Sequence, residues 1–249
     1  ARPEGWDGWA DREVDYELFG HPNHQVQRAL FRLAGQLTYF GPHRGAPDRA
    51  YIPVADEAIV GPDSWGDWAT PQRSFAGFME FELLNQMLDQ LDIPHQFEPS
   101  FKADGGEVGV SGWHLTDRRS KAPVTPDQVG YGVSQLLPIV HACILASQRV
   151  IAIEEPELHL HPRLQAKLGN LFTFSLKRGN QIIVETHSES ILLRVRRLVR
   201  AGKLRPNEVA VLYVDNPDDG DVFIRRMRLG TQGELLDPWP TGFFDDSLA

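Results

Sequence analysis

Apolar and polar positions follow their most regular pattern in the second half of the chain. Four short runs rich in apolar residues predict buried strands, at 150–153, 181–185, 209–214 and 222–229. Two amphipathic segments between them predict helices, at 162–177 and 188–201. Because apolar strands alternate with helices, we expect an α/β fold with a parallel sheet flanked by helices.

The first half of the chain has a less regular pattern and predicts a mixture of helices, loops and short strands. Apolar residues recur at helical spacing in three segments, at 24–37, 75–91 and 133–147. Between the last two, the segment 96–115 reads as strands around a turn at Asp104-Gly105-Gly106. This half therefore predicts an α+β arrangement rather than a continuation of the parallel sheet.

Composition narrows the class of protein without identifying it. The 249 residues are 41% apolar and 24% charged, as in ordinary globular proteins, and the formal net charge is −9. A negative surface argues against nucleic-acid binding unless a local basic patch is present. The chain has a single cysteine, Cys143, which is consistent with a reducing compartment, so we expect a cytoplasmic protein. We expect the Cys143 side chain to be buried and to fill space in the core. No apolar run approaches the roughly 18 residues of a membrane span, and no membrane contact is expected.

Two adjacent acids end the first predicted strand of the regular half. Glu154 and Glu155 follow Val-Ile-Ala-Ile, which places carboxylates at the carboxyl edge of a parallel sheet, where ligands bind in such folds. Nucleotide hydrolysis needs one carboxylate near Mg²⁺ and a second that orients or deprotonates water. The alternative is a pair of solvated acids ahead of a helix N-terminus, where negative charge is favourable.

Two further segments make the first interpretation stronger. Thirty residues later, an apolar strand again ends in polar side chains, here Glu185-Thr-His187-Ser. Upstream, Gly130 and Gly132 open an apolar helix, and glycine allows close backbone approach. Ser134 and exposed N–H groups at this helix start suit a phosphate. Each segment alone also fits a structural role, as a capped helix start or a histidine held in a crevice.

In this order, the motifs resemble the C-terminal lobe of ABC-type ATPases, which are P-loop NTPases. The sequence Ile-Glu-Glu-Pro-Glu-Leu-His-Leu-His-Pro, followed by Glu-Thr-His-Ser, is most similar to bacterial AAA-family ATPases related to SMC and OLD proteins. The resemblance is strong over 129–249. This segment would be the C-terminal lobe, which contains the signature, the Walker B motif, the D-loop and the switch histidine. The resemblance implies that 1–128 is an insertion or helical region of the same ATPase head.

The resemblance also implies a role for individual residues. Glu154 would hold Mg²⁺, Glu155 would activate water, and His187 would sense the γ-phosphate of ATP. A degenerate signature would contact the nucleotide of the opposite subunit through four residues, Gly130, Gly132, Ser134 and Gln135. The segment 156–161 would be the D-loop, which crosses the dimer interface.

One element of such ATPases does not occur in the sequence. No Gly-x-x-x-x-Gly-Lys-Ser/Thr loop is present, so the chain lacks a phosphate cradle of that pattern. Because the chain starts without methionine, we expect the Walker A lobe upstream of residue 1, or on another chain. The complete protein would then bind and hydrolyse ATP as a homodimer around nucleotide, and this chain alone would be inactive. The alternative is a degenerate, non-hydrolysing assembly module in a defence or DNA-maintenance complex.

Two other kinds of site can be considered. Glu157, His159 and His161 are close in sequence, but the helix expected at Pro162 disfavours their convergence on a metal. Six basic residues form a dense run and could contact DNA, although most such runs are solvated helix faces: Arg194, Arg196, Arg197, Arg200, Lys203 and Arg205.

Overall fold

The structure is a computed structural model that describes residues 37–42, 78–104, 107–125, 128–215 and 222–238. Its helices are α3 (Phe78–Gln90), α4 (Tyr131–Leu145), α5 (Pro162–Lys177) and α6 (Glu189–Arg200), with a 3₁₀ turn at Pro206–Glu208. Its strands are β1 (Leu37–Phe40), β2 (His95–Asp104), β3 (Glu107–Asp117), β4 (Pro123–Val124), β5 (Val150–Glu154), β6 (Gln181–Glu185), β7 (Val211–Asp215) and β8 (Phe223–Met227). The helix expected over 24–37 lies almost wholly outside these residues.

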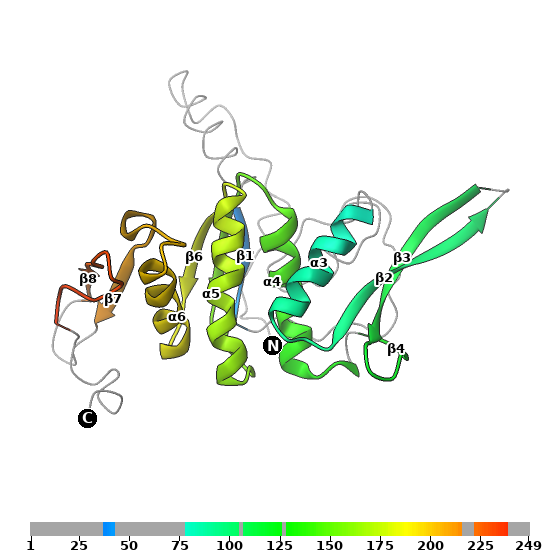
Figure 1. The fold of residues 1–249 in the computed structure, drawn as a ribbon, viewed down its shortest axis with the longest axis horizontal. Coiled ribbons are helices and arrows are strands. Elements are labelled where there is room, and N and C mark those ends of the chain that lie inside the picture. The colour runs from blue at the N-terminus through cyan, green and yellow to red at the C-terminus, as the bar shows by residue number, and fades with distance from the viewer. Residues whose placement is uncertain (1–36, 43–77, 105–106, 126–127, 216–221, 239–249) are drawn as a thin grey trace, which may run out of the picture. The chain divides into compact units, whose positions relative to one another are not determined.

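A sheet with the strand order β1-β5-β6 carries the site. β5 and β6 are parallel and in register from Val150 opposite Gln181 to Glu154 opposite Glu185. Helix α4 contacts β5, and α5 contacts β6 (Figure 1). The predicted α/β class, with parallel strands and flanking helices, is therefore confirmed.

The predicted parallel sheet does not extend to the strand after α6. Within the described residues, β7 pairs with β8 in a separate two-stranded antiparallel sheet, with Val211 opposite Met227 and Asp215 opposite Phe223. The segment between these strands is rich in turn formers, and a hairpin closes more readily than a distant pairing. The two strands were correctly predicted, but the sheet to which the first belongs was not.

Local sequence signals account for the starts of α5 and α6. His161 caps α5 by accepting a hydrogen bond from the Arg163 amide at 3.2 Å, and Pro162 occupies the first helical position. Ser188 caps α6 by accepting from the Ile191 amide at 3.4 Å. The link from β6 to the Ser188 cap is two residues long, and the link from β5 to the His161 cap is six residues long.

The region ahead of α4 is an antiparallel hairpin with a helix packed beside it. β2 pairs with β3 from His95 opposite Asp117 to Asp104 opposite Glu107, which confirms the predicted strands on either side of the turn. At the other end, the Asp117 carboxylate accepts hydrogen bonds from the Arg119 and Ser120 amides, both at 2.8 Å.

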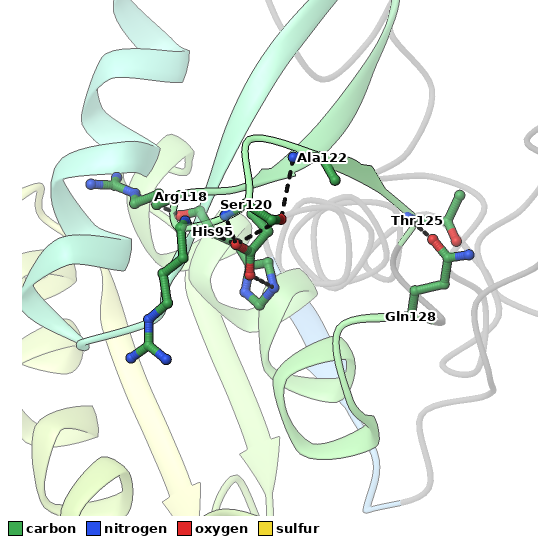
Figure 2. A network of polar contacts seen from close by, with 8 residues as sticks. His95, Arg118, Ser120, Ala122, Thr125 and Gln128 are labelled. Atoms are coloured by element: carbon green, nitrogen blue, oxygen red, sulfur yellow. Dashed lines mark hydrogen bonds and ion pairs between the residues drawn. The ribbon is translucent and has the colours of Figure 1, made fainter.

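Further polar contacts continue this turn toward α4. The Ser120 hydroxyl accepts from the Ala122 amide at 3.3 Å (Figure 2). The Gln128 side chain accepts from the Thr125 amide at 2.9 Å, two residues before the glycine that precedes α4. The approach to α4 is thus held by local hydrogen bonds.

Burial lowers the pKa of His95, and the neighbouring Asp117 carboxylate opposes that shift.

One hydrophobic core joins α3, the hairpin, α4, β5 and α5. Its fully buried side chains include Leu84, Leu115, Leu137 and Ile151. Cys143 belongs to this core, and burial raises the pKa of its thiol to about 12, in keeping with the predicted role as filler. No helix in the described part of the chain is long and apolar enough to cross a membrane. The division into 1–128 and 129–249 stays a prediction.

Candidate functional site at the carboxyl edge of β5 and β6

The two strand ends bring acidic residues together. Glu154 is the last residue of β5 and lies opposite Glu185, the last residue of β6. The next residue, Glu155, has a φ of 42°, so the chain leaves the pleat immediately after the strand. Its amide still donates to the Glu185 carbonyl at 2.9 Å, which holds the turn against β6. Adjacent acids can therefore serve one edge of the sheet instead of opposite faces.

The histidine after β6 lies beside the second acid. His187 Nε2 is 3.9 Å from Glu155 Oε1, an ion-pair separation longer than a hydrogen bond. The His187 side chain is 72% exposed and that of Glu155 is 30% exposed. Both side chains are thus partly accessible at the edge of the sheet. Their roles toward a nucleotide remain predictions.

A third acid connects the two loops. The Glu157 carboxylate accepts a hydrogen bond from the His187 amide at 2.6 Å through Oε1. Its other oxygen, Oε2, is buried and has no hydrogen-bond partner among the described residues. Glu157 therefore bridges the loop after β5 and the loop after β6, thirty residues apart in sequence.

A glutamine on α5 makes a second bridge between the same loops. The Gln165 side chain donates to the Leu160 carbonyl at 2.9 Å and accepts from the Ser188 hydroxyl at 2.8 Å. Ser188 also caps α6, so the start of that helix is tied to the loop after β5. Nothing in the sequence indicated this role for Gln165, because helical periodicity does not identify the partners of a polar side chain.

The start of α4 meets the loop after β5. Gly130 has a φ of 87°, a conformation that glycine adopts readily. At Gly132, a Cβ atom would lie 3.0 Å from the His159 carbonyl carbon and closer still to its oxygen. The Tyr131 and His159 rings are 4.8 Å apart in an edge-on arrangement, and Tyr131 is 50% exposed. The predicted signature and D-loop segments are therefore adjacent.

Ser134 and Gln135 differ from the expected exposed position. They are only 2% and 3% exposed, and the Ser134 amide donates to the Gly130 carbonyl at 3.0 Å. The Ser134 hydroxyl donates to the Tyr131 carbonyl at 2.8 Å. Because Ser134 lies one turn inside the helix, the N–H groups without intrahelical partners belong to Tyr131, Gly132 and Val133. A role for Ser134 or Gln135 toward a nucleotide remains a prediction.

The carboxylates at this edge are the type of ligand that Mg²⁺ takes in proteins. No group of three or more His, Cys, Asp or Glu side chains converges in the described part of the chain. Mg²⁺ is usually held by one or two carboxylates with phosphate oxygens and water, and it does not need a full protein cage. Glu154, with Glu185 opposite on the neighbouring strand, is suited to that kind of site.

Most of the basic run on and after α6 contacts this chain itself. Arg194 donates to Asn170 at 2.8 Å, Arg196 to the Gly233 carbonyl at 2.7 Å, and Arg200 to the Gln232 carbonyl at 3.2 Å. A further member, Arg205, pairs with Glu208 at 2.8 Å. These contacts favour a structural role, and DNA contact through this run stays a prediction.

Sequence comparison identifies the family. The family model described as "AAA domain, putative AbiEii toxin, Type IV TA system" matches residues 7–194, and the chain belongs to this family. A second model, "Protein of unknown function (DUF3696)", matches residues 204–249. The chain is thus a relative of bacterial AAA ATPases, as its strand-end motifs predict. No curated protein matches it.

Solved structures of SMC heads are similar over part of the chain. An Smc head bound to the C-winged helix domain of ScpA has 13% identity and a TM-score of 0.44, covering 60% of this chain and 42% of that chain. A structure described under ATP-driven dimerization and DNA stimulated activation of SMC ATPases has 11% identity and a TM-score of 0.41, covering 59% and 83%. An Smc head with an extended coiled coil from Pyrococcus furiosus, bound to the C-terminal domain of ScpA, has 10% identity and a TM-score of 0.41, covering 60% and 34%. The chain therefore spans less than half the length of the first and third of these.

Proposed function

We propose that this chain is the hydrolysis-triggering lobe of an ATPase that dimerises around ATP and Mg²⁺. The observation that supports this most is the edge where β5 and β6 end together, with Glu154 opposite Glu185 and Glu155 beside His187. The phosphate-binding loop would come from an upstream lobe or from another chain. This chain together with that lobe or chain is called the complete ATPase below.

Different residues at the edge would bind the metal and the phosphate and transfer the proton. Glu154 would hold Mg²⁺, which neutralises charge on the phosphate oxygens when bound. Glu155 would accept a proton at its carboxylate from the attacking water and orient it for in-line attack. His187 would donate a hydrogen bond from its imidazole to the terminal phosphate.

The start of α4 would complete the site of a second copy. The N–H groups at Tyr131, Gly132 and Val133 form a helix N-terminus that favours an anion. The N-terminus of α4 follows a different loop from the one that carries the acids. The His159 ring lies against Tyr131 at this N-terminus. In a two-fold arrangement, each lobe would place this surface against the nucleotide held by the other.

Tyr131→Asp in the complete ATPase tests this arrangement. We expect ATP-dependent association to weaken about 5- to 30-fold, because one added negative charge near a triphosphate costs on the order of 1–2 kcal/mol. The fold should be retained, since a carboxylate is favourable in the first turn of a helix. The measurement is light scattering with and without ATP, in a Glu155→Gln background that prevents turnover.

Tyr131→Asn is the matched control, because it removes the ring without adding charge. If the Asp and Asn variants associate equally well with ATP, the start of α4 does not face a nucleotide. Association of the wild-type protein without ATP would contradict the nucleotide-dependent dimer itself.

A second candidate is a non-hydrolysing assembly module. It keeps the same fold and contacts but needs no base at Glu155. ATP-dependent association without turnover in the complete ATPase would favour it.

A further inference from the structure

Glu157 is not among the residues that the proposed chemistry uses. Its side chain nevertheless makes the shortest described hydrogen bond at this edge, 2.6 Å from Oε1 to the His187 amide nitrogen. A hydrogen bond to a charged acceptor is about twice as strong as one between neutral groups. The carboxylate is also partly enclosed, because Oε2 is buried.

The bond constrains the residue that carries the candidate phosphate sensor. His187 lies in the two-residue link between the end of β6 and the Ser188 cap of α6. Its imidazole is exposed, so few packing contacts hold it, and its backbone position sets where the ring can reach. The Glu157 bond therefore fixes the histidine from its main chain while leaving the ring accessible.

The same acid belongs to the loop that meets α4. The Glu157 carbonyl accepts from the Leu160 amide at 3.0 Å, which closes a turn containing His159. The His159 carbonyl in turn lies against Gly132 at the start of α4. A displacement at the start of α4 would thus reach His187 through one short turn and one hydrogen bond.

We infer that Glu157 is the positioning residue for His187, holding it beside Glu155 and linking it to the start of α4. Gln165 supports the same geometry one residue further on, through Leu160 and Ser188. The effect on turnover rests on the proposed function. The hydrogen bond and its role in holding the loop do not.

Hydrogen exchange in this chain tests the bond directly. In Glu157→Ala we expect the His187 amide to exchange about 10- to 100-fold faster, the factor that corresponds to losing a charged hydrogen bond. The amides of Ile183 and Val184, inside β6, should exchange as in the wild-type protein. Glu157→Gln keeps an acceptor oxygen and should restore most of the protection. Glu82→Ala, which removes an exposed acid on α3, should change none of these rates.

Turnover of the complete ATPase supplies an independent readout. Glu157→Ala should lower kcat at least about tenfold with KM for ATP nearly unchanged, and Glu157→Gln should recover most of it. Unchanged exchange at His187, or equal acceleration across β6 and α6, would overturn the inference. So would full kcat in Glu157→Ala. If the wild-type protein shows no turnover at all, the proposed function fails, and the exchange rates still decide the role of Glu157.

Discussion

Glu155→Gln in the complete ATPase is expected to slow ATP hydrolysis about 10²- to 10⁴-fold while leaving ATP binding intact. The amide has the shape of the carboxylate but cannot accept a proton from water. Its backbone contact with Glu185 does not depend on the side chain, so the turn after β5 should persist. Turnover is measured by phosphate release, and binding by calorimetry with ATP.

Glu185→Gln is the matched control, because this acid ends the neighbouring strand at the same edge. Near-normal turnover in Glu155→Gln, with loss of turnover in Glu185→Gln, would assign the base to Glu185 instead. Loss of ATP binding in Glu155→Gln would show that the carboxylate holds the nucleotide complex together and does not act only in the chemical step.

Gly132→Ala is expected to destabilise the chain by about 1–3 kcal/mol, the usual cost of forcing extra atoms into a packed region. The new Cβ would meet the backbone of His159, which cannot turn aside as a flexible side chain can. The loop at 156–161 should therefore shift, and its amides should exchange faster. Thermal unfolding and hydrogen exchange of this segment measure the two effects.

Gly130→Ala separates this contact from backbone strain. A Cβ at Gly130 meets no atom within 4 Å, so its cost comes only from the φ of 87°. Exchange at 156–161 should then stay as in the wild-type chain. Equal loop exchange in both variants would mean that the glycine at 132 is not required for the approach of the loop to α4.

The strands and helices that a local pattern can specify were predicted well. α5 and β6 have the predicted bounds. Pro162 marks the start of α5, and a short apolar run specifies β6. Strand β1 was not predicted, since Leu37 continues a helical spacing and four residues are too few to show alternation. β7 was assigned to the wrong sheet for a different reason, because the alternation of strands and helices does not distinguish a strand of the parallel sheet from one that pairs with the next strand in the chain.

In the candidate site, some features follow from residue type and could be predicted, whereas others depend on packing and could not. Glu154, Glu155 and His187 were predicted as one group, because parallel strands end at the same edge of a sheet. The burial of Ser134 was not predicted, since it depends on which face of α4 packs into the core. The bridges made by Glu157 and Gln165 could not be predicted from the sequence, because predicting them requires the atomic positions of two loops and a helix.

ATP turnover with and without the phosphate-binding loop tests the central claim most directly. Phosphate release is measured for this chain alone and for the complete ATPase, each with Mg²⁺ and again with the metal chelated. We expect release at background from the chain alone, and Mg²⁺-dependent release from the complete ATPase. Turnover by the chain alone, or none from a complete ATPase that binds ATP, would contradict the assignment of this lobe.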